Sequence, residues 1–319
     1  MNYIKSQHSF TSSNKVDKIS YYIYTPVNGK AKALVQIVHG MCEYAERYEH
    51  FIDFLCKNGY AVISHDHLGH GNSAAEHPDL GYFAPDKGWI CLIKDVRHVM
   101  LIGRQMFGRI PRFIMGHSMG SLVTRCLLAK YSSDTDGAVI MGTAGRNPAI
   151  DMAIMIADAE IMRHGVKSRS YTLNNLLFGM SNARVEEKRT EFDWLTRDEQ
   201  VVARYCGDRR CNFVFTASGF RDLFMLAGYA NSNSWFGKVR KDLPMLVTSG
   251  TADPVGSYGK GVTEFFKRLD AKGFSDVTLK LWDGARHEIL NETNRLEVYD
   301  DILLWLDGLT EKCSRKDNG

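Results

Sequence analysis

Two kinds of hydrophobic pattern alternate along much of the chain, and each predicts a different element. Short, almost continuously apolar runs predict strands buried on both faces of a sheet, and apolar residues every three or four positions predict amphipathic helices. Strands are predicted at 19–24, 33–39, 60–64, 112–115, 138–141, 244–249 and 277–282. Helices are predicted at 44–57, 89–107, 119–131, 257–271 and 288–309. This alternation indicates an α/β fold in which helices flank a parallel sheet.

The alternation stops between Gly145 and about Val239. This stretch lacks a clear buried strand and contains helix-like pieces rich in Met, Ile and Leu, followed by a charged run at 184–199. We therefore expect a core at 1–144 and 240–319 that is interrupted by a helical cap at 145–239. An independent second domain inserted in a loop is the alternative. The polar residues 311–319 are expected to fray.

The composition is average, and it excludes several classes of protein. Of the 319 residues, 44% are hydrophobic and 24% are charged, so we expect a buried core rather than disorder. The net charge of +3 is too small to indicate a nucleic-acid-binding surface. The best apolar stretch, 149–162, contains three acidic residues and is shorter than the roughly 20 apolar residues of a membrane-spanning helix.

The cysteines bear on the compartment and on possible metal ligands. Their number is odd, at seven, and the N-terminal residues lack the basic and apolar regions of a secretory leader. We therefore expect a cytoplasmic protein with reduced thiols. Cys206 and Cys211 are spaced like a ligand pair, but no partner pair follows, so structural or surface thiols are expected. Cys42 is interpreted either as a packed residue or as a reactive thiol.

The candidate nucleophile is Ser118. It lies in Gly116-His117-Ser118-Met119-Gly120, between a predicted strand and a predicted helix. This is the G-x-S-x-G pattern in its required context, because the chain must turn sharply there and the two glycines avoid side-chain clashes. The serine hydroxyl is thereby exposed, next to backbone N–H groups at a helix N-terminus.

The candidate base and acid follow from chain order and strand ends. In this fold the serine is followed by an acid and then by a histidine, on loops at the carboxyl ends of strands. Only His164 and His287 follow the serine, and His164 falls within the inserted stretch. We therefore predict His287 as the base. Asp253, after the strand at 244–249, is predicted as the orienting acid, with Asp283 as the competitor.

The oxyanion hole requires two backbone N–H groups. Met119, directly after the nucleophile, is predicted to supply one. The other is expected from the loop after the strand at 33–39, where Met41 follows His39 and Gly40. A methionine side chain is compatible with this role because only backbone atoms act.

Several motifs now occur together in order. They are His39-Gly40-Met41-Cys42-Glu43-Tyr44-Ala45-Glu46-Arg47-Tyr48, Asp66-His67-Leu68-Gly69-His70-Gly71-Asn72-Ser73, the Gly-His-Ser-Met-Gly elbow, the Ser-Gly-x-x-Asp-Pro turn and the final Gly-x-x-His. With them the chain resembles the α/β-hydrolase family, in its monoglyceride lipase and lysophospholipase branch, over roughly 15–144 and 240–310. Two positions depart from the usual pattern. Tyr44 replaces a histidine, and Met41 stands where a small residue is common.

The resemblance implies a fold and an activity. The expected fold is an eight-stranded, mostly parallel sheet flanked by helices, with a helical cap inserted after the sixth strand. The expected activity is hydrolysis of esters of monoacylglycerols or lysophospholipids through an acyl-enzyme, with no metal and no organic cofactor. Flexible cap methionines suit an acyl chain, and the cap could also touch membranes transiently. No nucleic-acid partner is expected, and the oligomeric state is left open.

Three alternatives compete with this interpretation. On the same fold, the chain could be an esterase for non-lipid acyl groups, a peptidase or a cofactor-free haloperoxidase. It could be a catalytically silent binding protein, which the presence of Ser118, Asp253 and His287 argues against. The run at 65–70 also resembles the H-x-H-x-D-H motif of metallohydrolases, but Gly69 occupies the position of the aspartate. Hydrogen-bonded histidines in a loop are therefore the preferred interpretation of that run.

Overall fold

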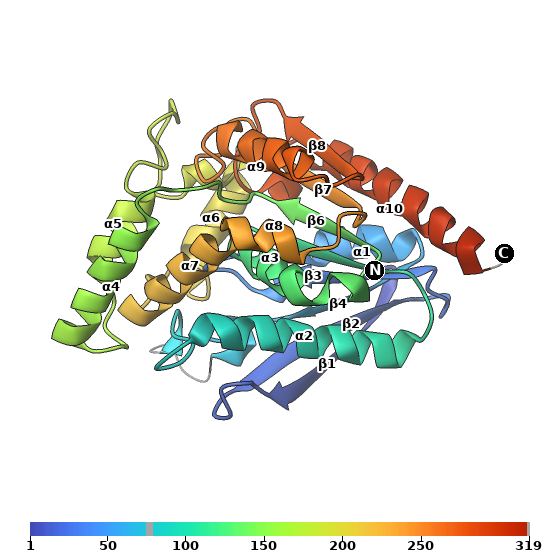
Figure 1. Ribbon diagram of the computed structural model, residues 1–319, viewed down its shortest axis with the longest axis horizontal. Coiled ribbons are helices and arrows are strands. Elements are labelled where there is room, and N and C mark those ends of the chain that lie inside the picture. Colours follow the sequence, from blue (N-terminus) through green and yellow to red (C-terminus); the bar gives the residue numbers. More distant parts are fainter. Residues whose placement is uncertain (75–78, 318–319) are drawn as a thin grey trace.

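The computed structural model describes residues 1–74 and 79–317 (Figure 1). Within them, eight strands form one sheet in the order β1-β2-β4-β3-β5-β6-β7-β8. The strands are β1 (Tyr3–Thr11), β2 (Lys18–Pro26), β3 (Ala33–Val38), β4 (Tyr60–His65), β5 (Arg112–His117), β6 (Gly137–Met141), β7 (Met245–Gly250) and β8 (Val277–Trp282). Pairing is antiparallel at β1–β2 and β2–β4 and parallel elsewhere. The predicted eight-stranded α/β fold is confirmed.

Helices cover both faces of the sheet (Figure 1). They are α1 (Glu49–Lys57), α2 (Gly88–Phe107), α3 (Met119–Tyr131), α4 (Ile150–His164), α5 (Tyr171–Phe178), α6 (Glu199–Gly207), α7 (Ala217–Ala230), α8 (Asn233–Lys238), α9 (Lys260–Ala271) and α10 (Arg295–Asp317). One hydrophobic cluster joins α2, α3 and α9 to the sheet, and another joins α1 and α10 to it. Both faces of the inner strands are therefore buried, which explains their nearly continuous apolar sequences.

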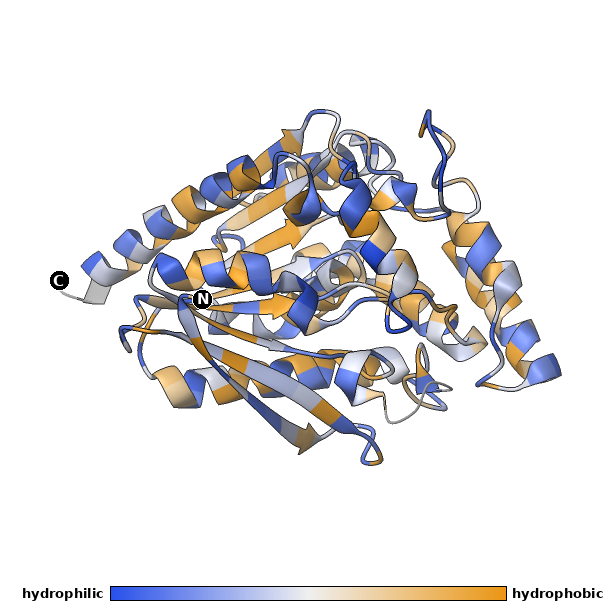
Figure 2. Cartoon of the chain, turned by 180° about the vertical axis from the view of Figure 1, so that it is seen from behind, coloured by the Kyte–Doolittle hydropathy of each residue, from blue (hydrophilic) through white to orange (hydrophobic). Residues whose placement is uncertain are grey.

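Some predicted boundaries are wrong. Strand β1 was not predicted, because it is an edge strand with mostly exposed residues and no apolar run. The helix predicted at 288–309 is interrupted after a short 3-10 turn, and α10 begins only at Arg295. The polar tail predicted to fray instead continues α10 as far as Asp317, while 318–319 lie outside the described residues. Figure 2 shows hydrophobic colours concentrated in the inner strands and mixed along the β1–β2 edge.

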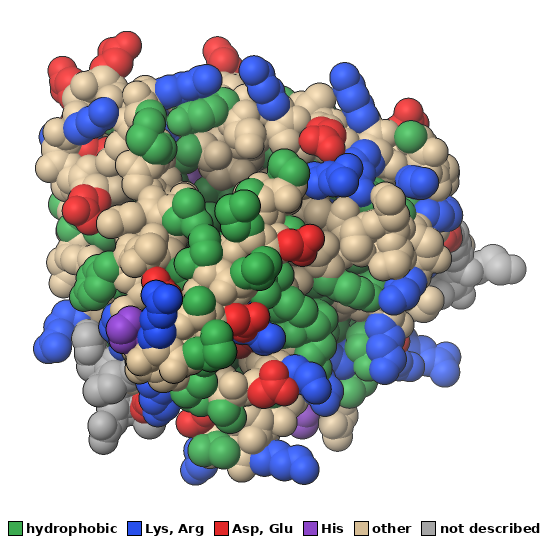
Figure 3. All heavy atoms as spheres, turned by 60° about the vertical axis from the view of Figure 1, so that its left-hand side comes forward, with side chains coloured by type: hydrophobic (Ala, Val, Ile, Leu, Met, Phe, Trp, Pro, Cys, Tyr) green, Lys and Arg blue, Asp and Glu red, His purple; other side chains and the backbone are tan. Residues whose placement is uncertain are grey.

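Helices α4 to α8 lie between β6 and β7, in the stretch that lacked the alternating pattern. Helix α7 packs against α2 and α3, and α4 packs against α7. On α4 and α5, apolar side chains remain on the surface, on the side of the molecule that Figure 3 brings forward. We refer to residues 145–239 as the inserted segment. No helix in the described part of the chain is long and apolar enough to cross a membrane.

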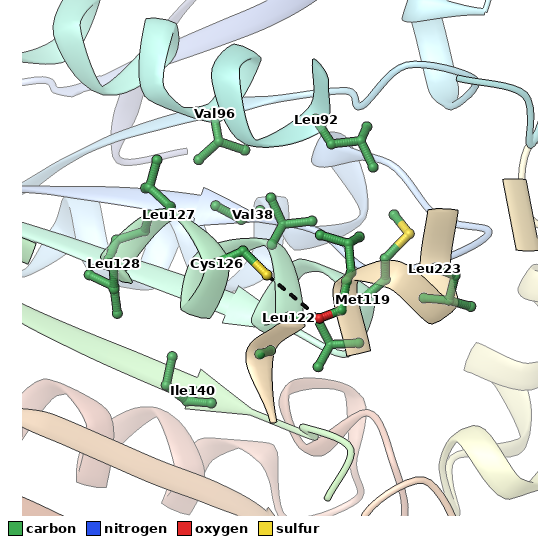
Figure 4. Close-up of a cluster of buried hydrophobic side chains, with 14 of the residues drawn as sticks. Val38, Leu92, Val96, Met119, Leu122, Cys126, Leu127, Leu128, Ile140 and Leu223 are labelled. Carbon is green, nitrogen blue, oxygen red and sulfur yellow. Dashed lines mark hydrogen bonds between the residues drawn. The ribbon is translucent and has the colours of Figure 1, made fainter. Parts of the chain in front are cut away.

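Helix α3 is the most deeply enclosed helix near the sheet's centre. Residues Met119 to Ala129 are all buried. Figure 4 shows Leu122, Cys126 and Leu127 of α3 among Val96 of α2, Val38 of β3 and other apolar side chains. A helix that is buried on every side cannot rotate or shift without breaking this packing. Its first residue is therefore held firmly at the carboxyl end of β5.

Candidate active site

Ser118 occupies the turn between β5 and α3. Its backbone has a φ of 53° and a ψ of −121°, an uncommon conformation for a residue with a side chain. Its N–H donates to the Met141 carbonyl at 2.9 Å, which holds the turn against β6. A Cβ on Gly120 would lie 2.1 Å from the Val38 carbonyl oxygen, and one on Gly116 would lie 2.4 Å from the Gly120 carbonyl oxygen. Both glycines are thus needed for the chain to pass so closely.

The structure brings Asp253 and His287 together. His287 Nδ1 lies 2.9 Å from Asp253 Oδ1, and both side chains are buried. The Ser249 hydroxyl donates to Asp253 Oδ2 at 2.8 Å, and the Val255 N–H donates to Oδ1 at 2.9 Å. Burial opposes ionisation of Asp253, but His287 and these donors hold its pKa below the usual value. Asp253 is therefore an ionised acceptor for the His287 Nδ1–H.

The competing residues lie elsewhere. Asp283 is exposed and accepts a hydrogen bond from the Thr251 hydroxyl at 3.2 Å instead of contacting a histidine. His164 is an exposed residue at the end of α4. Neither belongs to the cavity that Ser118 and His287 share. The geometry thus favours Asp253 over Asp283 and His287 over His164.

The loop after β3 is anchored on both sides of Met41. The Gly40 N–H donates to Glu43 Oε1, and the Cys42 N–H donates to His70 Nε2 at 3.2 Å. Met41 itself lines the same cavity as Ser118. Met119, the first residue of α3, is buried directly after the serine. Both backbone N–H groups that the sequence singled out are therefore carried by firmly held segments next to Ser118.

Ser118 and His287 open into a cavity of about 340 Å³. Part of its wall comes from β-strand loops of the core, and part comes from the inserted segment, including Phe178, Phe192, Trp194, Leu195, Tyr205, Phe213 and Val214. Sequence reasoning missed six of these seven residues, all except Phe178. Five of them lie outside the α-helices, and Tyr205 lies on the short, charged helix α6 that the sequence did not predict. The methionines predicted to suit an acyl chain point elsewhere. Met152, Met155, Met162 and Met180 are exposed on the surface and do not line this cavity.

The inserted segment also supports the loop that carries His287. The His287 N–H donates to the Trp194 carbonyl at 3.4 Å, and the Trp194 and His287 ring centroids lie 5.1 Å apart. The Glu288 N–H donates to the Leu195 carbonyl at 2.7 Å. Arg286 donates to the Asp193 carbonyl at 2.6 Å. The insertion therefore packs directly against the candidate base, and it contributes to the site as well as to its wall.

The histidines that resembled a metal motif form a buried cluster. His39, His65, His67 and His70 are fully buried. His65 Nε2 lies 3.2 Å from His67 Nδ1, and the His67 N–H donates to His39 Nε2 at 2.9 Å. Asp66 points away from them and accepts the Ala45 and Asn72 N–H groups, both at 2.8 Å. Among the described residues, no group of three or more histidine, cysteine or acidic side chains is placed to hold a metal ion.

The three cysteines singled out by the sequence differ in environment. Cys42 is buried, its thiol donates to the Phe213 carbonyl at 3.1 Å, and burial raises the pKa of the thiol well above its usual value. Cys211 is also buried, with a pKa raised by burial to about 12. Cys206 is only partly buried. Cys42 therefore has the surroundings of a packed residue rather than those of a reactive thiolate.

An eight-stranded, mostly parallel sheet with helices on both faces and a serine turn after β5 defines an α/β-hydrolase. The family described as serine aminopeptidase, S33, matches residues 29–294. The chain belongs to this family, as a carboxylic ester hydrolase of the α/β fold. The resemblance drawn from the sequence motifs is confirmed.

Similar proteins include lipases and esterases. A monoacylglycerol lipase of Mycolicibacterium smegmatis is 26% identical over 307 residues, which cover 95% of this chain and 97% of the relative. A thermostable carboxyl esterase of Bacillus coagulans, solved in complex with glycerol, is 30% identical with a TM-score of 0.89, covering 96% of this chain and 99% of that one. A lipase solved in an open form is 28% identical with a TM-score of 0.86 and the same coverage.

Proposed function

We propose that the chain hydrolyses carboxylic esters of lipid-like acyl groups, such as monoacylglycerols or lysophospholipids. The observation that carries this proposal is the shared cavity. It joins Ser118 and His287 to aromatic and aliphatic side chains of the inserted segment. The apolar part of the cavity wall favours an acyl chain over a charged group, while Asn174, Asn175, Asn182 and Asn212 also line the cavity. The lipase names of the similar proteins point in the same direction.

The proposed reaction passes through an acyl-enzyme on Ser118. Its Oγ attacks the ester carbonyl carbon while His287 Nε2 accepts the hydroxyl proton, and Asp253 stabilises the resulting imidazolium. The N–H groups of Met41 and Met119 bind the oxyanion, each contributing about 3 kcal/mol to lowering the barrier. His287 then gives the proton to the departing alcohol. In the second half-reaction a water molecule takes the place of Ser118: it gives a proton to His287, attacks the acyl carbonyl carbon and releases the acid from Ser118. Side chains and backbone supply every step, so the proposal includes no cofactor and no metal.

We further propose that residues 145–239 act as a helical cap on a core formed by 1–144 and 240–319. The support is the wall that this segment contributes to the cavity and its contact with the His287 loop. Under this proposal the cap sets which acyl groups are accepted. A panel of p-nitrophenyl esters of increasing chain length should then give a maximum in kcat/KM at a medium or long acyl chain.

A peptidase of the same fold is the second candidate, since the family description names a serine aminopeptidase. Recognition of a free peptide N-terminus requires an unpaired acidic group. Of the carboxylates lining the cavity, Glu43 and Glu288 beside Ser118 and His287 are both paired with Arg47, which favours a neutral substrate next to the nucleophile. The exposed Glu191 is the carboxylate of this wall that a peptide amino group would have to use. Faster turnover of an aminoacyl p-nitroanilide than of any ester would support the peptidase instead.

The decisive experiment for the proposed nucleophile combines labelling with substitution. A fluorophosphonate probe should modify Ser118 in the wild-type chain, as located by peptide mass spectrometry. Ser118→Ala should lose ester turnover by at least about 10³-fold and remain folded, with an unchanged circular dichroism spectrum. Labelling at another residue, or an active Ser118→Ala variant, would overturn the assignment. Activity should persist in EDTA, which a metallohydrolase would not tolerate.

The surface of the proposed cap offers a membrane contact. Exposed apolar side chains gather on α4, α5 and the turns beside them, namely Met152, Met155, Met162, Tyr171, Leu176, Leu177 and Met180 (Figure 3). We propose that this face rests transiently on lipid surfaces that contain the substrate. Cys42, Cys126 and Cys211 are buried thiols outside any disulfide, which supports a reducing, cytoplasmic location.

A further inference from the structure

Glu43 is a buried carboxylate with an unusual set of donors. Its Oε1 accepts hydrogen bonds from the Gly40 N–H, from the Tyr48 hydroxyl at 2.8 Å and from His117 Nδ1 at 3.0 Å. Gly40 precedes Met41, and His117 precedes Ser118. A single oxygen atom therefore joins the loop after β3 to the strand end that carries the nucleophile.

The second oxygen of Glu43 extends the connection to the loop of the base. Arg47 Nη1 donates to Glu43 Oε2 at 3.1 Å. The same guanidinium donates to both oxygens of Glu288, at 2.8 and 2.9 Å. Glu288 directly follows His287, and His117 Nε2 lies 3.3 Å from the His287 carbonyl oxygen. The network thus touches all three segments that surround Ser118.

The charges in this network are mutually compensating. Burial opposes ionisation of Glu43, but His117 and Arg47 hold its pKa well below the usual value. Burial likewise opposes protonation of His117, yet the hydrogen bond and charge of Glu43 raise its pKa above the usual value. The other charged neighbour of His117 is Glu288. The ring centroids of His117 and His287 lie 4.7 Å apart. Charge-assisted bonds of this kind hold geometry more firmly than neutral ones.

We propose that Glu43 is a positioning residue for hydrolysis, which orients both oxyanion-hole donors through Gly40 and His117 and the base loop through Arg47. This inference rests on the proposed function of Ser118. Oxyanion donors act only at about 2.7–3.1 Å from the developing charge. Since Met41 and Met119 contribute backbone N–H groups, their alignment depends on what holds their loops. Glu43 bonds to Gly40, which directly precedes Met41, and to His117, which lies two residues before Met119.

Glu43→Gln tests this role with little change in volume. Glu43 accepts from four donors, but glutamine replaces one acceptor oxygen with an NH₂ group that must face a donor. The loops should then relax, and misplacement of about 1 Å costs on the order of 100-fold in rate. We expect kcat for a p-nitrophenyl ester to fall by about 10- to 100-fold, with KM changed by less than about threefold. The affinity for a trifluoromethyl ketone analogue should fall in parallel with kcat.

The control is an equally buried carboxylate away from the site. Asp95 accepts from the Ser12 hydroxyl at 2.6 Å and from the Ser13 N–H at 2.7 Å. Asp95→Asn should lower the melting temperature while kcat and analogue affinity stay near wild type. This contrast separates positioning of the site from a general loss of stability, because a merely structural carboxylate would lower stability alone.

A second variant keeps the test valid if Glu43→Gln does not fold. Arg47→Lys keeps the charge but loses the bidentate contact with Glu288, so kcat should fall with little change in KM. The proposal is overturned if folded variants at both positions keep wild-type kcat and analogue affinity, or if only KM rises. Ser118→Ala is measured in parallel. An active Ser118→Ala would refute the proposed function itself, whereas an inactive one with a fully active Glu43→Gln would refute only the role of Glu43.

Discussion

At the scale of single residues, burial and hydrogen bonding separate the two aspartates near the base loop. Asp253 is fully buried, ionised and bonded to His287 Nδ1, while Asp283 is exposed and bonded to Thr251. They lie at similar positions relative to the ends of β7 and β8, so local sequence hardly distinguishes them. A direct comparison of the two side chains is therefore the sharpest test of the acid.

Asp253→Asn should lower kcat by about 10³- to 10⁴-fold at pH 7. An amide at this position no longer favours the tautomer in which Nδ1 carries the proton, and it cannot stabilise the imidazolium. Asp283→Asn should stay within about twofold of wild type, because this side chain is exposed and its only described hydrogen bond joins it to the half-buried Thr251. Steady-state kinetics on a p-nitrophenyl ester provide the measurement. Equal losses in the two variants, or a larger loss at Asp283, would contradict the assignment.

The sequence indicates some of these residues and not others for a physical reason. Ser118 is recognisable because the glycines, strand and helix that define its turn lie within a few residues of it. Glu43 and Trp194 act through partners 74 and 93 positions away, His117 and His287. Local pattern cannot reveal such pairs. Glu43 did occur in a recognised motif, but its donors became evident only once the chain was folded.

At the scale of elements, hydrophobic pattern predicts well where one face or both are buried. Helix α3 matches its predicted range because each end borders a strand or turn with a clear sequence marker. Strand β1 escapes prediction because it pairs only with β2 and leaves most side chains exposed. The sequence predicts the apolar character of α4 and α5, and Phe178 at the end of α5 lines the cavity, but the methionines predicted to suit an acyl chain are exposed instead. The hydrophobic pattern of a sequence identifies an amphipathic helix, but it does not show whether the apolar face of that helix packs against the protein or remains exposed.

Helix α4 provides the element-scale prediction, which concerns the proposed membrane contact. Met155 and Met162 are 71% and 82% exposed, and burying a methionine side chain contributes about 1.5 kcal/mol or more. The double variant Met155→Glu and Met162→Glu should bind phosphatidylcholine vesicles at least about tenfold more weakly in a flotation assay. Turnover of a short-chain soluble ester should remain at the wild-type level, because neither side chain lines the cavity.

Two exposed leucines on α10 give a matched control. Leu296 and Leu304 are 66% and 75% exposed, on a helix that packs against α1 rather than among the helices of the inserted segment. Replacing both leucines with glutamate adds the same charge as the double variant on α4 and removes a similar amount of exposed apolar surface. Vesicle binding should then stay near wild type. Equal weakening by the two double variants would mean that net charge, and not the α4 face, governs the interaction.

At the scale of the whole molecule, the parallel sheet gathers residues that are distant in sequence. Strands β3, β5, β7 and β8 all end at the same edge, and the loops that follow them carry Met41, Ser118, Asp253 and His287. A parallel sheet places loops after successive strands together, so these residues converge without any local signal between them. The buried network of Glu43 and Arg47 then ties those loops to one another.

The histidine cluster lies where β3 and β4 end at this edge, and it imposes a cost on the fold in acid. His39, His65, His67 and His70 are fully buried, and burial lowers all four pKa values. Repulsion by neighbouring histidines lowers the pKa values of His39, His65 and His67 further. The pKa is about 3 for His65 and about 4 for His70. Each histidine is thus neutral in the folded protein at a pH where the unfolded chain, with a pKa near 6.5, already binds a proton.

We therefore expect the free energy of unfolding to fall as pH drops from about 6.5 towards 4. Each histidine with a depressed folded pKa removes about 1.4 kcal/mol per pH unit across that window. Asp66 and Asp222 oppose this, because burial raises their pKa values to about 6 and about 7, so they take up protons first in the folded state. Burial also lowers the pKa of His50 to about 4 and raises the pKa of Asp95, so each side gains one group. Five histidines against three carboxyls leave a net loss of about 3 kcal/mol per pH unit.

Urea denaturation at pH 7.5, 6.5, 5.5 and 4.5 measures this slope. His65→Asn should reduce it by about 1.4 kcal/mol per pH unit, whatever the substitution does to stability at neutral pH, because it removes one proton-binding group from the unfolded chain. The same change at the exposed His8 should leave the slope as in wild type, since that ring meets solvent in both states. An unfolding free energy that stays constant between pH 6.5 and 4.5 would mean that the buried histidines already carry protons in the folded protein. The cluster would then have to be described as charged rather than neutral.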